Sequence, residues 1–147
     1  MRFGAQAAFA AALVLVSAAG AAAAGLPRPA NEVFQFQASR TDAGGVKLHW
    51  SIAPGTYLYR SSISVERDGS ALKLALPPGE AKDDPFVGKT EIYRSALEVT
   101  LPRDEVAGAS SLRVAYQGCA ENVFCYAPLS RTLDLGDLAA GGHGETP

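Results

Sequence analysis

The sequence predicts an all-β fold, namely an immunoglobulin-like antiparallel β-sandwich with a cysteine-bearing hairpin and a cap loop. Three observations support this fold class. Apolar and polar residues alternate along about seven to nine short segments, turn residues separate these segments at intervals of roughly 8–12 residues, and no segment has the period of an amphipathic helix. Two antiparallel sheets packed face to face would bury the apolar side of every such strand.

The first half of the domain contains the most regular alternation. It begins at residues 33–37, where Phe34 shares one side of the strand with the next aromatic residue. Residues 46–52 alternate strictly and place Trp50 in the predicted core. A further extended run is expected from 57 to 65, after a proline-glycine break and before the hairpin-type turn Asp-Gly.

The second half repeats this pattern less regularly. We expect strands at 72–76, which two prolines and a glycine end, and then at 97–101 and 112–116. A last strand should include residues 133–135. Together these segments complete the predicted sandwich.

Residues 80–89 differ from the other segments. They have no apolar period, they contain several charges, a proline and a glycine, and they carry the apolar pair Phe86-Val87 in their middle. We interpret this segment as a loop with an aromatic tip. Because an aromatic side chain in a charged loop needs a surface to cover, the loop is a candidate cap.

The N-terminus has the features of an export signal. A positive n-region at Arg2 precedes an apolar stretch at 7–16 and a small-residue tail that ends in an A-x-A-type cleavage site at 22–24. We therefore expect a cleaved signal peptide at 1–24 and export to an oxidising compartment, which the resemblance described below specifies as the periplasm. An uncleaved membrane anchor is the alternative, because the run from 5 to 24 is nearly long enough to span a bilayer, but this run is mostly alanine and no basic cluster flanks it to stop transfer.

The remaining chain is long enough for one domain. We expect a stiff leader at 25–30, the folded domain at 31–135 and a flexible, glycine-rich tail at 136–147. Without Arg2 the chain carries 12 basic and 15 acidic side chains, which argues against nucleic acid or anionic lipid as a partner. No later segment has the length of a membrane span.

The two cysteines lie close together in the sequence. Cys119 and Cys125 flank the residues Ala-Glu-Asn-Val, and the apolar and aromatic runs on either side predict a short β-hairpin with one thiol on each arm. A disulfide is the default state of an exported pair. Closing so short a loop removes only about 2.4 kcal/mol from the unfolded state in the chain-entropy model, so a structural staple and a redox-active pair both stay open.

The sequence around the cysteines does not predict a self-activated thiolate. No basic residue lies between 116 and 128, and Glu121 adds a negative charge between the thiols. Exchange would then depend on a partner thiol and on access to the sulfurs. Two thiolates could also bind Cu(I), but only His49 and His143 remain to complete such a site, and we expect neither a metal nor another cofactor.

Three spaced motifs resemble the N-terminal periplasmic domain of the thiol:disulfide interchange protein DsbD. They are Tyr-Leu-Tyr-Arg at 57–60, Phe-Val-Gly-Lys-Thr-Glu-Ile-Tyr-Arg at 86–94, and Tyr-Gln-Gly-Cys at 116–119 followed by Phe-Cys-Tyr at 124–126. They occur in the same order as in that family, and the resemblance extends over about residues 31–135.

The resemblance implies an immunoglobulin-like domain with a redox-active disulfide, that is, a protein-disulfide reductase module. Its electrons would come from a thioredoxin-like donor and pass to periplasmic disulfide isomerases or to thioredoxin-like acceptors of cytochrome c maturation. Cys125 would form the mixed disulfide with a partner, and Cys119 would resolve it. Phe86 would be the tip of the cap loop, Tyr57 and Tyr59 would line the site, and Asp84 would be an acidic residue on the cap side.

Two features depart from the family pattern. Pro85 occupies the place of a second carboxylate, so a proton-transfer role would fall to Asp84 alone or be absent. No membrane helices or thioredoxin-like domain follow in this sequence, so we expect either a separate shuttle or part of a longer protein. The alternative function is a non-catalytic immunoglobulin-like binding module with a structural disulfide.

Overall fold

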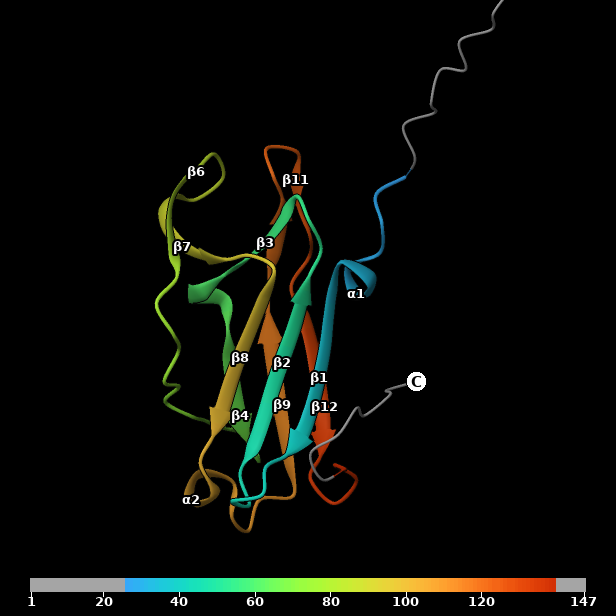
Figure 1. The fold of residues 1–147 in the computed structure, drawn as a ribbon, viewed down its shortest axis with the longest axis vertical. Helices are drawn as coiled ribbons and strands as arrows, with labels where there is room; N and C mark the ends of the chain where they lie inside the picture. The colour runs from blue at the N-terminus through green and yellow to red at the C-terminus, as the bar shows by residue number, and fades with distance from the viewer. Residues whose placement is uncertain (1–25, 140–147) are drawn as a thin grey trace, which may run out of the picture.

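The computed structural model describes residues 26–139, and the predicted signal peptide and the end of the predicted tail lie outside this range. Within it, two antiparallel sheets form a sandwich, and a third sheet of short strands lies at one end of the long axis (Figure 1). The predicted all-β sandwich is confirmed. The third sheet was not predicted.

The first sheet of the sandwich has the strand order β1-β2-β8. Its strands are β1 (Phe34–Arg40), β2 (Val46–Ile52) and β8 (Ala96–Leu101). Short helices flank it, α1 (Ala30–Val33) before β1 and α2 (Arg103–Val106) after β8. The strict alternation of β2 buries every second residue, as predicted, and Trp50 is fully buried.

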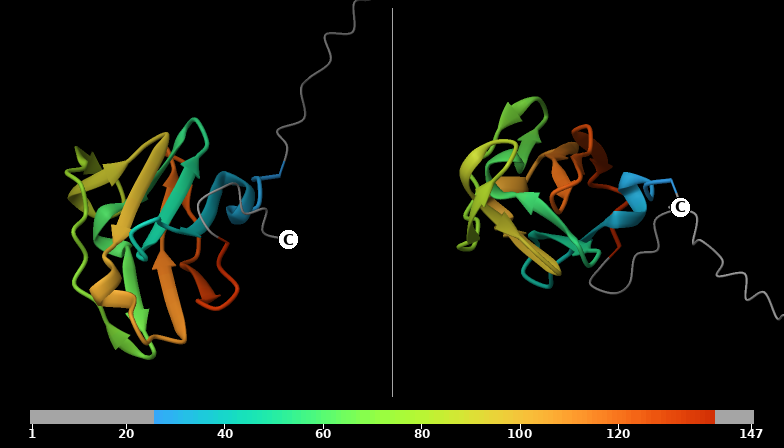
Figure 2. Two further views of the ribbon diagram at one scale, coloured as in Figure 1. Left: turned by 60° about the horizontal axis from the view of Figure 1, so that its bottom comes forward. Right: turned by 90° about the horizontal axis from the view of Figure 1, so that it is seen from above.

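The second sheet has the strand order β12-β9-β4-β5. Its strands are β12 (Leu129–Asp134), β9 (Ser111–Tyr116), β4 (Ser64–Arg67) and β5 (Ser70–Ala71). It lies behind the first sheet, and the two layers enclose the main core (Figures 1 and 2). Trp50 of one layer meets Tyr116 of the other edge to face, with ring centroids 5.6 Å apart.

The third sheet has the strand order β11-β10-β3-β7-β6. Its strands are β11 (Phe124–Cys125), β10 (Gly118–Ala120), β3 (Thr56–Tyr59), β7 (Gly88–Tyr93) and β6 (Glu80–Asp84). A 3-10 turn, η1 (Arg60–Ser62), links β3 to β4, and a single residue, Gln117, separates β9 from β10. Two strands of the sandwich therefore continue directly into this sheet and fix its position.

Two expectations for the strands were wrong. The run from 57 to 65 is not one strand, because η1 breaks it into β3 and β4 of different sheets. Residues 72–76 form no strand, although the Leu72 amide still donates to the Val65 carbonyl. Their alternating leucines are half-buried against the core, so the pattern reflects side-chain burial and not backbone pairing.

The segment at 80–89 is a β-hairpin and not an irregular loop. Asp84 pairs with Gly88, and the ladder continues to Glu80 opposite Ile92. The strand β6 lies at the edge of its sheet, where charged residues are common and no apolar period is needed. Only residues 85–87 form the tip. We call residues 80–93 the cap hairpin.

Candidate functional site

The third sheet brings the two cysteines together. Cys119 on β10 lies directly opposite Cys125 on β11, with Cα atoms 3.9 Å apart, and the two form a disulfide. Asn122 takes the left-handed conformation, with φ of 56°, that the tight turn between the arms requires. The predicted cysteine hairpin is confirmed.

The two sulfurs differ in their access to solvent. Cys119 is fully buried against Tyr57 and Tyr59, whereas Cys125 is only partly buried and lines a groove of about 700 Å³ together with Tyr59 and Phe86. An attacking thiolate therefore reaches the Cys125 sulfur more easily than the Cys119 sulfur.

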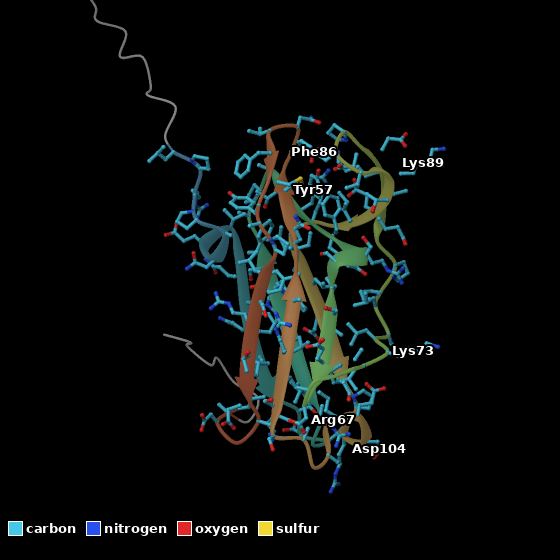
Figure 3. The ribbon with its side chains drawn as sticks, turned by 180° about the vertical axis from the view of Figure 1, so that it is seen from behind. Tyr57, Arg67, Lys73, Phe86, Lys89 and Asp104 are labelled. Atoms are coloured by element: carbon cyan, nitrogen blue, oxygen red, sulfur yellow. A yellow bond between two sulfur atoms is a disulfide. The ribbon has the colours of Figure 1, made fainter. Side chains whose placement is uncertain are left out.

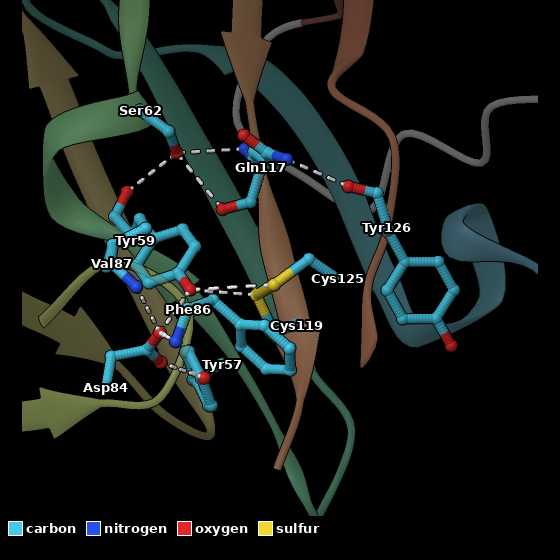
Figure 4. The surroundings of a disulfide bond; sticks show 10 residues. All are labelled: Tyr57, Tyr59, Ser62, Asp84, Phe86, Val87, Gln117, Cys119, Cys125 and Tyr126. Carbon is cyan, nitrogen blue, oxygen red and sulfur yellow. Dashed lines mark hydrogen bonds between the residues drawn. A yellow bond between two sulfur atoms is a disulfide. The ribbon is translucent and has the colours of Figure 1, made fainter. Parts of the chain in front are cut away.

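Tyr57, Tyr59 and Asp84 form a hydrogen-bonded cluster behind the disulfide (Figure 4). Both tyrosines lie on β3 and point to the same side, and their hydroxyls donate to the Asp84 carboxylate, that of Tyr59 at 2.9 Å. The Tyr59 hydroxyl also lies 3.0 Å from the Cys119 sulfur and 3.6 Å from the Cys125 sulfur. A disulfide sulfur carries no hydrogen, so only the Tyr59 hydroxyl could donate in these two contacts, and its single hydrogen is already directed at Asp84.

The Asp84 carboxylate is buried but remains the charged member of the cluster. Burial alone would raise the pKa of Asp84, but hydrogen bonds from Tyr57, from the Phe86 and Val87 amides and from Tyr59 outweigh it and hold the pKa below its usual value. Burial and the hydrogen bond to Asp84 raise the pKa of Tyr59 to about 12, and they raise the pKa of Tyr57 further. Both tyrosines are thus neutral donors at physiological pH.

Phe86 lies at the tip of the cap hairpin beside the disulfide (Figure 4). The Asp84 carboxylate accepts hydrogen bonds from the Phe86 amide at 2.8 Å and from the Val87 amide at 3.1 Å. These two hydrogen bonds fix the tip in place. The side chains of Phe86 and Val87 stay 48% and 57% exposed, and Val123 of the cysteine turn is 70% exposed. Figure 3 shows Phe86 and Tyr57 together at this end of the molecule, far from Arg67 and Asp104.

The structure thus gathers all six residues that the sequence identified: Cys119, Cys125, Tyr57, Tyr59, Asp84 and Phe86. Sequence reasoning missed Ser62, whose hydroxyl accepts the Gln117 amide at 2.9 Å and lies 2.8 Å from the Tyr59 carbonyl. Ser62 therefore ties β3 to the segment that enters β10. A serine in a 3-10 turn gives no signal in sequence for such a role.

The negative charge of Glu121 is compensated in the fold by two cations that the sequence around the cysteines does not contain. No basic residue is near it along the chain, but folding brings Lys82 and Arg94 within 2.6 and 2.9 Å of its two carboxylate oxygens. The site is therefore not flanked by an uncompensated negative charge. Lys82 belongs to the cap hairpin and Arg94 follows it directly. Both are far from Glu121 in the sequence, so the sequence alone does not predict these ion pairs.

Neither a metal site nor a membrane span is found in the part of the chain that the structure describes. Residues 26–139 contain no group of three or more His, Cys, Asp or Glu side chains that could hold a metal ion. None of their helices is long and apolar enough to cross a bilayer.

The depressed pKa of Asp84 predicts an acid-sensitive fold. Its ionised form stabilises the native state above the usual pKa near 4, and this contribution is lost as the pH falls through the lower native value. We expect Asp84→Asn to reduce the free energy of unfolding at pH 7 by about 1–3 kcal/mol, with the two curves converging towards about pH 2. Urea unfolding measured from pH 7 to pH 2 tests this.

The neighbouring Asp83→Asn variant is the matched control, because Asp83 is exposed on the same strand. It should retain the wild-type pH dependence. A constant difference between wild type and Asp84→Asn over the whole pH range would contradict the assignment.

Comparison with known proteins gives a consistent result. The family model for "Thiol:disulfide interchange protein DsbD, N-terminal" matches residues 26–137. The Thiol:disulfide interchange protein DsbD 2 of Pseudomonas aeruginosa is 45% identical over 120 residues, which cover 80% of this chain and 20% of that protein. The DsbD of Cronobacter sakazakii is 44% identical over 108 residues, 73% of this chain and 19% of that protein. The chain thus spans about a fifth of these relatives.

Solved structures support the same relationship. The reduced DsbD N-terminal domain of Neisseria meningitidis has a TM-score of 0.63 and 29% identity, covering 74% of this chain and 88% of that one. A second structure from the same organism contains the complex between the DsbD N-terminal and PilB N-terminal domains. Its matching chain has a TM-score of 0.61 and 28% identity, covering 74% of this chain and 86% of that one.

Proposed function

The chain belongs to the family of DsbD N-terminal domains, and we propose that it is a periplasmic thiol:disulfide exchange module that uses the Cys119–Cys125 pair. The observation that carries the proposal is the partly buried Cys125 sulfur in a groove, joined to a fully buried Cys119 sulfur beside the Tyr59 hydroxyl. We also propose residues 31–135 as the exchange domain, behind a cleaved signal peptide at 1–24.

Reduction of the disulfide begins with a thiolate of a thioredoxin-like donor. It attacks the Cys125 sulfur, the Cys119–Cys125 bond breaks, and Cys119 leaves as a thiolate. The Tyr59 hydroxyl, 3.0 Å from the Cys119 sulfur, is placed to donate a hydrogen bond to this leaving group when its single hydrogen turns from Asp84 to the new thiolate. The second thiolate of the donor then attacks the donor's first cysteine sulfur, which is bonded to Cys125 in the mixed disulfide. The donor leaves with its own disulfide, and Cys125 is released as a thiolate.

Delivery of the two electrons follows the same path in reverse. The Cys125 thiolate attacks a disulfide of a periplasmic acceptor and forms a mixed disulfide, and the Cys119 thiolate then attacks Cys125 and releases the reduced acceptor. We propose periplasmic disulfide isomerases and the thioredoxin-like proteins of cytochrome c maturation as acceptors. The related DsbD N-terminal domain of Neisseria meningitidis forms a complex with a PilB N-terminal domain, which supports a protein partner at this kind of domain.

The surface around the site supports docking of a protein. Four large apolar residues are exposed in the described part of the chain, and three of them, Phe86, Val87 and Val123, belong to the cap tip and the cysteine turn. Exposed apolar side chains gathered in one place are typical of interaction surfaces. A purely structural disulfide would not require them.

The reduction potential tests the proposed function against the structural alternative. We expect a value in the range of thiol:disulfide carriers, roughly −120 to −270 mV. The measurement equilibrates the protein in thiol:disulfide buffers of known potential and counts free thiols by alkylation and mass spectrometry. The variant that lacks both cysteines is the control and should show no change, whereas a wild-type potential below about −300 mV would indicate a structural staple.

A further inference from the structure

An ion-pair cluster connects the cysteine hairpin to the cap hairpin. Glu121, in the turn between the two cysteines, receives Lys82 Nζ at 2.6 Å on one carboxylate oxygen and an Arg94 guanidinium nitrogen at 2.9 Å on the other. Arg94 is also 3.3 Å from Glu80 at the start of β6. The cluster thus joins the turn of the cysteine hairpin to the first strand of the cap hairpin and to the residue that follows its second strand.

The position of these pairs in the sheet is unusual. Lys82 lies on β6, the edge strand at one end of the order β11-β10-β3-β7-β6, whereas Glu121 follows β10 near the opposite edge. The ion pair therefore crosses the face of the sheet above β3. The cations of Lys82 and Arg94 lie 5.2 and 5.4 Å from the centroid of the Tyr57 ring, which is fully buried beneath them.

Burial strengthens this contact beyond an ordinary surface ion pair. The Lys82 side chain is only 12% exposed, and the Glu121 and Arg94 side chains are 31% and 34% exposed. The hydrogen bond from Lys82 is the largest of several effects that together lower the pKa of Glu121. Loss of either partner would leave a poorly solvated charge without its counterion.

The cluster is coupled to the cap tip through a short chain of contacts. Lys82 and Asp84 lie on the same short strand, and Asp84 accepts the amides of Phe86 and Val87 and the hydroxyl of Tyr57. A movement of the end of β6 away from the cysteine turn would therefore carry the cap tip with it.

We propose that Glu121 is a positioning residue that, with Lys82 and Arg94, forms an ionic latch holding the cap hairpin closed beside the disulfide. The inference rests on the proposed function in one respect, that the cap controls access to Cys125. The latch opens when the ion pairs break, and a partner that competes for Glu121 or for the two cations opens the cap as it docks.

The test measures how fast small thiols form a mixed disulfide with the oxidised domain. The thiolate attacks Cys125, the Cys119–Cys125 bond breaks and Cys119 takes up a proton, so no protein partner is needed. Two reagents of different charge are used, cysteamine and 2-mercaptoethanesulfonate, and initial rates are followed by mass spectrometry. We expect Glu121→Gln and Lys82→Met each to raise both rates by about twofold to fivefold.

A direct effect of charge on the reagents gives a different pattern. Glu121→Gln would then accelerate chiefly the sulfonate, and Lys82→Met would slow it, because the two variants change the local charge in opposite directions. Acceleration of both reagents by both variants supports the latch. The double variant Lys82→Met/Glu121→Gln should react no faster than Glu121→Gln alone, because both substitutions break the same pair.

Two controls set the scale of the experiment. Glu66→Gln breaks an exposed ion pair with Arg113, 3.6 Å apart on the second sheet and away from the cap, and should leave the rates unchanged. Phe86→Ala removes the cap side chain itself and should accelerate both reagents at least as much as loss of the latch. If Phe86→Ala accelerates the reaction while Glu121→Gln and Lys82→Met do not, the latch is wrong and the cap is held by Asp84 alone.

Amide hydrogen exchange separates local opening from global unfolding. The latch predicts faster exchange of the Phe86 and Val87 amides in Glu121→Gln, with exchange in β2 unchanged. An equal increase in β2 would overturn the proposal, because the variant would then only destabilise the whole fold. Both measurements are independent of the reduction potential, so a potential typical of a structural disulfide would refute the exchange function without deciding the latch.

Discussion

Replacing Cys119 by alanine is expected to trap a mixed disulfide between Cys125 and a thioredoxin-like partner. The remaining Cys125 thiol is partly exposed in its groove and can still attack a partner disulfide, but no second thiol lies opposite it to release the product. Turnover should fall to the level of the variant that lacks both cysteines. Incubation with an oxidised thioredoxin-like protein, followed by non-reducing electrophoresis and mass spectrometry, detects the adduct.

The matched control is Cys125→Ala, which retains only the buried Cys119. Its thiol is buried against Tyr57 and Tyr59, so we expect little or no adduct under the same conditions. Equal trapping by the two variants would contradict the assignment of Cys125 as the attacking residue. Absence of an adduct with Cys119→Ala, despite a correctly folded domain, would contradict the exchange function.

The sequence predicted the parts of the site that depend on local pattern. The cysteine hairpin follows from two strand-like arms around a short turn, and the third sheet adds to it the tyrosines of β3, which the family resemblance had assigned to the site. Tyr57 and Tyr59 share one side of their strand because side chains alternate with a period of two. Leu58 between them belongs to the main core, which explains why this strand has no exposed face.

The sequence could not predict contacts that depend on how the third sheet is arranged in space. Asp84 lies in a segment that composition alone identifies as a charged loop, yet it is buried and bonded to two tyrosines that precede it by more than twenty residues. The Lys82–Glu121 pair is separated by 39 positions and crosses a sheet that was not predicted at all. The pattern of charges along the chain does not show which side chains will meet across the face of a sheet.

The leucines at 72–76 show the opposite error. Their alternation satisfies the usual criterion for a strand, but the two-residue strand β5 ends before them and the prolines that follow lack amide donors. Half-burial of every second side chain is therefore not a sufficient sign of a strand. A ladder also requires a free edge, and pairing along the edge of the second sheet ends with β5 in this fold.

Replacing Gly118 by alanine is expected to destabilise the fold more than any other single methyl addition at a glycine next to the site. A Cβ at this position would lie 2.5 Å from Phe34 Cζ and closer still to the Tyr57 carbonyl oxygen, and both residues are fully buried. The clash involves the backbone of β3, which pairs with β10 at this point and cannot move without opening the sheet. We expect a loss of about 3 kcal/mol in the free energy of unfolding.

Gly55→Ala is the matched control, because it adds the same methyl group in open space at a φ of +79°. It should cost only about 1 kcal/mol, from backbone strain alone. Urea unfolding of both variants with the disulfide intact compares the two costs. Equal destabilisation would mean that β3 and Phe34 shift to make room for the added methyl group at little cost. A larger cost at Gly118 means that the residue before Cys119 fixes how closely the cysteine hairpin approaches the core, and hence how deeply the Cys119 sulfur is buried beside Tyr59.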